Sequence, residues 1–303
     1  MVSWPDLGTR VTVRYRRPAG SDPPLTDAVG HLLAVDPVVR VRTKTGEVAE
    51  CAPTDVVALR VLTDTPIRTS QIRALEHAAA MAWPGAEHTW LDGWLLRAGH
   101  GADFAANSAL PLDISAHSGA IPEIVAWYDR RGLTPRLAIP DRLLALPSGV
   151  PDEHTERVLV RDVSAASIEE PDPSIALSAR PGDAWLRLHR EIPVAVLTAV
   201  IDGELIFGTH SDQALARAAL TVAPDGTRWV GLSQLHAVDD QSTAGAVAAL
   251  CEALLAWGTR RGATRAYLRS GDHHGPATIL ADSLGFRLHH HCRYVRARPM
   301  DSV

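Results

Sequence analysis

The stretch RWVGLSQLHAVDDQSTAGAVAALCEALLAWGTRRGATRAYL, residues 228–268, decides the fold. Its first part, Trp229 to Val238, is rich in strand-forming residues. After DDQST, apolar residues recur at the 3.6-residue spacing of a helix with one buried face, namely Val247, Leu250, Cys251, Leu254 and Leu255. Gly262 suits the end of that helix, and Tyr267 lies in the next strand-like run. The stretch therefore predicts a strand, a tight turn, a helix and a second strand.

The turn before this helix is a candidate anion site. Ser242 or Thr243 can cap the helix, because a hydroxyl accepts a hydrogen bond from a free first-turn N–H group. The remaining free N–H groups lie at the positive end of the helix dipole, where phosphate groups commonly bind.

Composition limits the class of protein. The chain has 303 residues, 46% hydrophobic content and a net charge of −5, which argues against a mainly nucleic-acid-binding protein. Its three cysteines are far apart and form no CxxC motif, so neither a disulfide framework nor a zinc site is expected. No run reaches the roughly 18 apolar residues of a membrane helix, and MVSWPDLGTR does not resemble a signal peptide. We expect a cytoplasmic protein that does not bind membranes.

The first 65 residues read as a small β-barrel. Five short strand-like runs are separated by turn signals, namely TRVTVRYR, AVGHLLAV, VVRVRT, EVAECAP and DVVALRVL. This spacing favours an SH3-like barrel. Arg14, Arg16 and Arg17 suggest nucleic acid, but the segment holds eight basic and eight acidic residues, so a structural or docking role is the better reading.

The rest of the chain predicts alternating helices and strands after Thr65-Pro66. Residues 147–182 contain many Pro, Ser, Asp and Glu residues, which we interpret as a linker with one strand, RVLVRDV. The other expected elements are a helix over 71–83 capped by Ser70, strands 93–99 and 104–112, a helix over 120–132, strand 136–139, a helix near 193–200, strand 205–210, a hairpin of 214–223 with 228–238, a helix over 276–284 and strand 290–298.

One internal similarity suggests duplication. AWYDRRGLTPR at 126–136 matches AWGTRRGATR at 256–265 in Ala, Trp, Arg, Arg, Gly and Thr, at an offset of 130 residues. Both copies lie at the end of a predicted helix that leads into a strand. So short a match can arise by chance, but two related lobes explain it better.

The order of elements resembles that of the GCN5-related N-acetyltransferase (GNAT) family, in particular an actinobacterial subgroup with an SH3-like domain in front. The segments that carry the resemblance are WLDGWLLRAGHG with ANSALP, AWYDRRGL, LLAWGTRRGATRAYL and SLGFRLHHHCRYV. It implies an α/β (α+β) fold, with a GNAT-like mixed sheet, flanking helices and two related lobes. The implied domains are an SH3-like barrel at 1–65, a degenerate GNAT-like lobe at 66–150 and the acetyltransferase lobe at 151–303.

The resemblance also implies a cofactor site. Some members of the subgroup are described as N-acetylglutamate synthases, so the implied donor is acetyl-CoA and the acceptor is a small amine such as glutamate. The backbone that would pair with the pantetheine arm is that of Leu235, His236 and Ala237, and the turn that would hold the pyrophosphate comprises Ser242, Thr243, Ala244, Gly245, Ala246 and Val247.

This chain departs from the family pattern at several of these positions. Of the three family positions at Ser242, Gly245 and Val247, only the glycine matches, and Val247 places a branched side chain where the phosphate should approach. His274 replaces the family's Asn before the last helix, and Ala281 replaces the Tyr that protonates the departing thiolate.

Candidate catalytic residues follow from the chemistry of the transfer. A base must take a proton from the amine, and the resemblance implies a base near His236 on the central strand. His210 ends the neighbouring strand and Glu204 begins it, and these two are the other candidates. Tyr294, His274 and His273 are the candidate acids in place of the missing Tyr. In the run His289 to His291 alternate residues face opposite sides, so a surface strand is favoured over a metal site.

We expect an N-acetyltransferase whose partners are acetyl-CoA and a small-molecule amine. The alternative is a non-catalytic GNAT-like protein that binds CoA or a partner protein, which the departures from the family pattern favour. An exposed last strand would allow two copies to pair as a homodimer.

Overall fold

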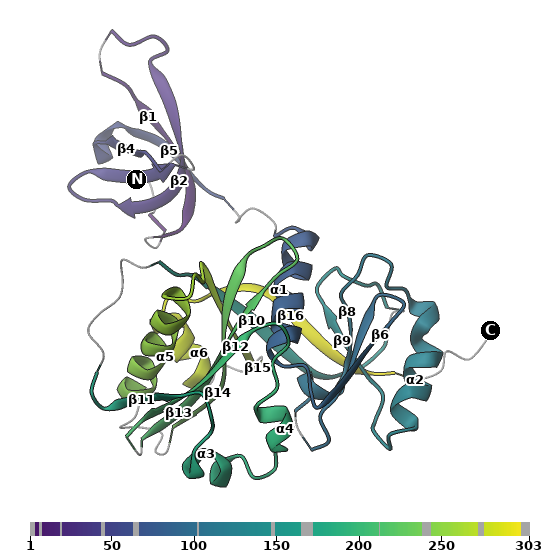
Figure 1. The fold of residues 1–303 in the computed structure, drawn as a ribbon. Coiled ribbons are helices and arrows are strands. Elements are labelled where there is room, and N and C mark those ends of the chain that lie inside the picture. Colours follow the sequence, from purple (N-terminus) through teal and green to yellow (C-terminus); the bar gives the residue numbers. More distant parts are fainter. Residues whose placement is uncertain are drawn as a thin grey trace. The chain divides into compact units, whose positions relative to one another are not determined.

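The computed structural model describes residues 4–5, 8–18, 20–43, 46–62, 67–101, 103–146, 149–164, 172–211, 213–237, 244–271 and 276–297. The chain divides into two compact units, residues 1–66 and 67–303 (Figure 1). Ser242, Thr243 and His274, which the sequence assigns to cofactor binding, lie outside the described residues, as does His273.

The first unit is a five-stranded antiparallel sheet in the order β4-β3-β2-β1-β5. Its strands are β1 (Arg10–Arg16), β2 (Leu25–Ala34), β3 (Val39–Thr43), β4 (Val48–Cys51) and β5 (Val56–Val61), with a 3₁₀ turn at Pro53–Asp55. Alternate residues point inward, so Val11, Val13, Leu32, Val39 and Val41 form the core of this unit. All five strands predicted from the sequence are confirmed.

The second unit is built on one eleven-stranded mixed sheet, ordered β11-β12-β13-β14-β15-β10-β16-β9-β8-β7-β6. The strands are β6 (Glu87–Leu91), β7 (Trp94–Ala98), β8 (Ala109–Pro111), β9 (Arg136–Pro140), β10 (Asp152–Asp162), β11 (Ile175–Ser178), β12 (Glu204–His210), β13 (Ala214–Val222), β14 (Arg228–Ala237), β15 (Arg265–Gly271) and β16 (Arg287–Arg296). Neighbours pair antiparallel except β14 with β15 and β8 with β9.

Six helices flank this sheet in the described residues: α1 (Thr69–Ala82), α2 (Ile121–Asp129), α3 (Asp183–Leu188), α4 (Val194–Leu197), α5 (Ala244–Thr259) and α6 (Pro276–Ser283). In Figure 1, α5 and α6 lie together at one end of the unit and α2 lies at the other, with α1 between them. This mixed sheet with flanking helices confirms the predicted fold class. None of the described helices is long and apolar enough to cross a membrane.

The two ends of the sheet repeat one topology. At one end the hairpin β12–β13 leads to β14, α5 and a parallel β15, and at the other the hairpin β6–β7 leads to β8, α2 and a parallel β9. Both helices are followed by a glycine with positive φ, at +64° for Gly132 and +87° for Gly262. Only glycine adopts that conformation without strain, so these two glycines of the matching segments hold the same turn.

The repeat extends to side-chain contacts. Arg131 donates to Glu87, the first residue of β6, at 3.0 Å, and its guanidinium lies over the Trp127 ring. Arg261 donates in the same way to Glu204, the first residue of β12, at 2.8 Å, and lies over Trp257. A set of three matching side chains in matching places favours two related lobes over a chance similarity.

Residues of the sheet alternate between two apolar layers. On β13, Leu215 and Ala219 pack in the layer that contains α1, whereas Ala216 and Ala218 pack in the layer that contains α5. The two helices therefore cover opposite faces of the same strands. Side chains can therefore contact one another at the candidate active site only if they lie on the same face of the sheet.

Three sequence-based expectations are wrong. The strand RVLVRDV expected within residues 147–182 is confirmed as part of β10, but the linker interpretation fails for 152–156 and 175–178, because β10 lies between β15 and β16 and β11 pairs with β12. β16 pairs with β10 and β9, so it is not an exposed strand for pairing of two copies. α1 begins at Thr69, and the Gln71 side chain, not Ser70, accepts a hydrogen bond from the Arg68 backbone N–H at 2.9 Å.

Candidate active site

The parallel strands β14 and β15 separate partway along their length. They pair from Trp229 with Arg265 to Leu232 with Leu268, although β14 continues to Ala237 and β15 to Gly271. β14 stays paired with β13 but gains one extra residue there, and Gln234 takes a φ of +53°. Such a bulge bends a strand away from its neighbour. The described strands β14 and β15 thus have no ladder pair beyond Leu232.

A cavity of about 170 Å³ lies at this separation, on the face of the sheet that α1 covers. Its walls include Trp83 beside α1, Ser233 and Gln234 on β14, and Tyr267 on β15. Burial raises the pKa of Tyr267 to about 12, so its hydroxyl is neutral at ordinary pH.

A carboxylate lines the cavity from the central strand β10. Glu156 accepts a hydrogen bond from the Tyr294 hydroxyl at 2.8 Å and one from Arg269 at 2.9 Å. His154 lies 3.9 Å from the same carboxylate and stacks on Phe104. Tyr294 is fully buried, and burial raises the pKa of its hydroxyl. Glu156 is therefore a carboxylate that two hydrogen bonds fix in place, and it lines the cavity.

A second carboxylate, that of Glu76, binds the same arginine, Arg269, as the first. Glu76 on α1 has no exposed surface and contacts both Arg269 and His290, the latter at 2.7 Å. Burial raises the pKa of Glu76, but the charge of Arg269 and the contacts of His290 outweigh burial and lower the pKa to about 2. Arg269 is thus held between two carboxylates, Glu76 and Glu156.

His289 and His290 lie inside this network, which corrects the expectation of a surface strand, whereas His291 is part-exposed beside Asp141. His290 is 3% exposed and His289 is 9% exposed, and their Nδ1 atoms are 2.8 Å apart. Burial and the charge of His290 lower the pKa of His289 to about 4, so His289 is neutral. Among the described residues there is no cluster of His, Cys, Asp or Glu that could hold a metal ion.

Two further arginines line the same cavity. Arg217 on β13 donates to the carbonyls of Leu197, Ala82 and Ala199 and to the Ser233 hydroxyl. Arg97 on β7 donates to the Trp83 and Ser108 carbonyls and the Ser108 hydroxyl. Burial lowers the pKa of Arg217 to about 9, which still leaves the guanidinium charged at neutral pH.

The predicted catalytic residues do not gather at one point. Tyr294 is in the network around Glu156, whereas Glu204 is in the exposed pair with Arg261. His210 lies 3.7 Å from Asp172 near the β11 edge. His236 is part-buried near His189, whose pKa is lowered by burial and by His236. The catalytic role of each stays a prediction.

The predicted cofactor residues lie along β14 and α5. Leu235 and Ala237 pack on the α5 side of the sheet. Ala244 is the first residue of α5, and a side chain at Gly245 would meet nothing within 4 Å. Ala246 and Val247 are buried in the apolar layer under the helix. Val247 is thus directed at the sheet.

Sequence reasoning missed Glu156, Arg269, Arg97, Arg217 and Tyr267. A signal is present in β10, where Glu156 precedes the apolar run Val158 to Val160 by one alternation, although the predicted strand begins only at Arg157.

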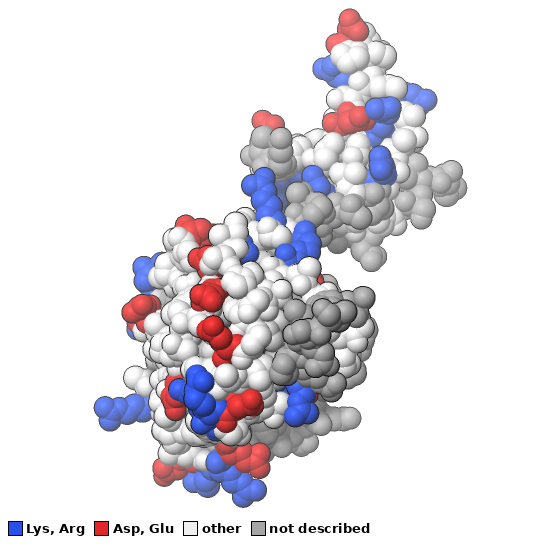
Figure 2. Space-filling view, turned by 90° about the vertical axis from the view of Figure 1, so that its right-hand side faces the viewer, with Lys and Arg blue, Asp and Glu red and all other residues white. Residues whose placement is uncertain are grey.

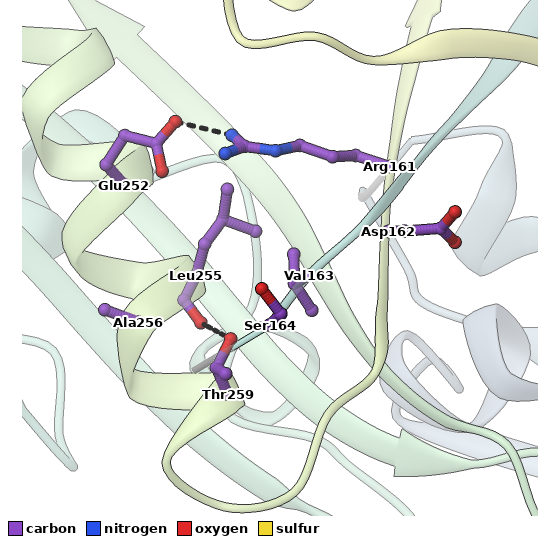
Figure 3. A pocket seen from close by; sticks show the side chains of 8 residues that line it. All are labelled: Arg161, Asp162, Val163, Ser164, Glu252, Leu255, Ala256 and Thr259. Carbon is purple, nitrogen blue, oxygen red and sulfur yellow. Dashed lines mark hydrogen bonds and ion pairs between the residues drawn. The ribbon is translucent and has the colours of Figure 1, made fainter. Parts of the chain in front are cut away.

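A second hollow, of about 50 Å³, lies between α5 and the end of β10 (Figure 3). Figure 3 shows Arg161 extended across it toward Glu252, with which it forms an ion pair, and Thr259 donating to the Leu255 carbonyl. It is smaller than the cavity beside α1, its arginine is ion-paired, and it contains none of the predicted site residues. The cavity beside α1 is the better candidate for the active site.

The fold and the separated strands beside a lined cavity define an acetyltransferase of the GNAT type. Residues 69–295 match the family model "Probable histone acetyltransferase Rv0428c C-terminal", and residues 5–60 match "Rv0428c N-terminal Sm-like domain". The chain belongs to this family. The protein "Probable histone acetyltransferase Rv0428c" of Mycobacterium tuberculosis is 66% identical over 300 residues, which cover 98% of each chain.

Solved structures show weaker likenesses. A GCN5-related N-acetyltransferase from Kribbella flavida is 14% identical with a TM-score of 0.48, covering 77% of this chain and 96% of that one. A GNAT-family protein from Novosphingobium aromaticivorans is 16% identical with a TM-score of 0.49, covering 73% and 97%. These values are too low to support conclusions about substrates.

Proposed function

We propose that this protein transfers an acetyl group from acetyl-CoA to a primary amine bound in the cavity beside α1. The observation that carries the proposal is the separation of β14 from β15 beyond Leu232 and Leu268, directly beside that cavity. The separation leaves strand backbone available to a ligand, and the cavity supplies a carboxylate for the acceptor.

Acetyl-CoA would lie on the opposite side of the separation, along β14 and the first turn of α5. The backbone of Leu235 to Ala237 would pair with its pantetheine arm. The pyrophosphate would lie near Gly245, where the space beside the backbone is open and Val247 is turned toward the sheet. First-turn N–H groups of a sixteen-residue helix suit such an anion.

Glu156 is the proposed base for the transfer. It takes a proton from the ammonium of the acceptor, and the free amine nitrogen then attacks the carbonyl carbon of the thioester. The bond from that carbon to sulfur breaks, and CoA leaves as a thiolate, which takes up the second proton that the attacking nitrogen loses as it becomes an amide. A thiol with a pKa of about 8.5 is a tolerable leaving group, so a strong acid is not essential. His154, beside Glu156 and partly exposed, offers the proton a route to solvent.

The acceptor is a primary amine, either a small one such as glutamate or a lysine side chain of a histone-like protein. The second class is suggested by the name of the Mycobacterium tuberculosis relative. Nucleic acid is not favoured as a partner. On the face shown in Figure 2, acidic and basic side chains of the coloured residues are interspersed, without one extended basic patch.

The test combines binding and catalysis. Calorimetric titration with acetyl-CoA should give micromolar affinity, with CoA as the comparison. Glu156→Gln should lower kcat by about 10²–10⁴-fold while acetyl-CoA still binds, because removing a general base affects the chemical step. Glu153→Gln is the matched control, since Glu153 is an exposed residue of the same strand, paired with Arg136.

Two outcomes would contradict the proposal. Absence of acetyl-CoA binding at millimolar concentration would exclude the cofactor site. Binding without transfer to any amine would instead favour a non-catalytic GNAT-like protein. Equal activity of the two glutamine variants would remove Glu156 from the role of base but leave the transferase in place.

A further inference from the structure

Among the described residues, two of the three arginines that line the cavity beside α1 form no ion pair, and this bears on what the cavity binds. Arg217 is 1% exposed and Arg97 is 4% exposed, and both line the cavity. Among the described residues, the hydrogen-bond acceptors of the two arginines are carbonyls and a hydroxyl in each case. Within the described residues, neither arginine forms an ion pair.

Arg269 shows the contrast within the same cavity. It contacts two carboxylates, Glu76 and Glu156, so its charge is fully compensated. The remaining acidic residue of the lining, Asp103, is exposed, and its carboxylate accepts from the Trp83 indole at 3.0 Å and the Ala106 N–H at 2.9 Å. The charge of Asp103 offsets part of the burial that lowers the pKa of Arg217, and the Arg217 guanidinium lies over the Trp83 ring. Neither contact is an ion pair, so an anionic ligand would still find a charged partner in both arginines.

The two guanidinium groups also have donors to spare. Each guanidinium carries five N–H groups in a fixed fork. The hydrogen bonds of the described residues use four on Arg217 and three on Arg97. Arg97 therefore keeps two donors and Arg217 keeps one. Spare N–H donors on paired arginines match the oxygen atoms of a carboxylate.

The lining of the cavity therefore combines two kinds of group. Arg97 and Arg217 have spare donors, and Glu156, held by Arg269 and Tyr294, is a carboxylate. A ligand with one anionic group and one amine would complement both kinds of group at once. A lysine side chain of a basic protein offers only the amine and would bring positive charge toward two arginines.

We propose that the acceptor is a small amino carboxylate, with its carboxylate bound by Arg97 and Arg217 and its amine directed at Glu156. The inference rests on the proposed acetyl transfer and names the substrate class for the same site. It selects a free amino acid or related amino carboxylate over a histone lysine.

The first experiment uses the unmodified full chain and matched acceptors. Acetyl transfer is measured for 4-aminobutyrate against butylamine and for β-alanine against propylamine, because the members of each pair differ by the carboxylate and have similar amine basicity. Glutamate and a histone tail peptide are measured beside them. We expect kcat/KM to be at least about tenfold higher for the carboxylate member of each pair, since hydrogen bonds to charged groups have that effect.

The second experiment needs no turnover. Glutarate, a dicarboxylate without an amine, should raise the unfolding temperature of the chain in the presence of CoA, whereas the uncharged glutaramide should not. In Arg97→Gln the preference for 4-aminobutyrate over butylamine should shrink, and Arg97→Lys should restore part of it. This ratio is independent of how much folded protein a variant yields.

Each outcome decides one point. Equal rates for the two members of each pair, or efficient transfer only to the histone peptide, would overturn the inference and leave the acetyltransferase function intact. Absence of transfer to every amine would defeat the proposed function, while protection by glutarate would still support the anion site. Absence of both would overturn the anion site.

Discussion

Glu76 holds Arg269, which in turn fixes the carboxylate of Glu156 in the candidate active site. It lies on α1 with no exposed surface, and it contacts Arg269 and His290 at once. Substitution by Gln keeps the shape and removes the charge, so Arg269 loses one of its two carboxylates. We predict that Glu76→Gln lowers the free energy of unfolding of residues 67–303 by about 3–5 kcal/mol, as for other broken buried pairs.

Urea unfolding followed by tryptophan fluorescence measures this change, because all tryptophans except Trp4 belong to residues 67–303. Glu204→Gln is the control. Glu204 forms an exposed pair with Arg261, so its loss should cost about 0–1 kcal/mol. If the two variants lose equal stability, the buried network does not stabilise the fold as we infer.

The same carboxylate predicts acid sensitivity. The pKa of Glu76 falls from 4.5 to about 2 on folding, because Arg269 and His290 outweigh the opposing effect of burial. A lowered folded pKa contributes stability above the unfolded value, and that stability is lost as the pH falls from about 5 toward 2. The urea midpoint of the unmodified protein should therefore drop over this range more steeply than that of Glu76→Gln. Parallel curves for the two proteins would contradict the assignment.

The buried charges could not be located from the sequence. Glu76 interrupts the apolar face of its helix four residues after Ile72, which is a signal that something must compensate it. Its partners Arg269 and His290, however, lie 193 and 214 residues away. Only the pairing of β10, β15 and β16 brings them together, and no local pattern encodes that order.

At the scale of elements, the approach of β14 to β15 depends on one glycine. A Cβ atom at Gly231 would lie 2.2 Å from the Tyr267 ring and hydroxyl, far inside van der Waals contact. Gly231→Ala must therefore displace a buried aromatic ring that lines the cavity. We predict a loss of about 1–3 kcal/mol of unfolding free energy, typical of overpacked cores, together with weaker acceptor binding.

Gly245→Ala provides the matched comparison on α5. Its position is open and its φ is ordinary, so the substitution should leave stability unchanged or raise it by up to about 1 kcal/mol. Urea unfolding of both variants tests the pair. Equal stability of Gly231→Ala and the unmodified chain would mean that Tyr267 moves aside without cost.

Local signals predicted most elements and failed where tertiary context decides. The stretch 228–268 has the periodicity of its structure, and β14, α5 and β15 follow it closely. β10 begins with the polar run Asp152 to Glu156, which suits a loop in isolation. In the folded chain this run pairs along its length with β16, and its inward carboxylate meets Arg269. The polar half of this strand is satisfied by distant charges, so its only local signal is that Glu156 continues the alternation of the apolar run after it.

At the scale of the whole molecule, the two ends of the large sheet repeat one arrangement, and residues from both ends line the cavity. Each end carries a hairpin, a helix crossover and a parallel strand pair with the same Glu, Arg and Trp contacts. The first lobe supplies α1 and Arg97 to a cavity whose other walls come from β10 and β13 to β15. The assignment of 66–150 and 151–303 as separate domains stays a prediction, because their strands form one sheet.

The division of the chain at residue 66 leads to the final prediction. Residues 1–66 have their own five-stranded sheet and their own core around Val11, Val13 and Val41. All residues assigned to the acceptor cavity and to acetyl-CoA belong to residues 67–303. A chain that begins at Ile67 should therefore fold and transfer acetyl groups to 4-aminobutyrate with kcat/KM within about twofold of the full chain, as expected for distant, independent parts. The measurement is made on both proteins at equal folded concentration, checked by urea unfolding. A folded but inactive truncated chain would show that the barrel completes the active site, whereas retained activity would assign the barrel to another task, such as docking a partner protein.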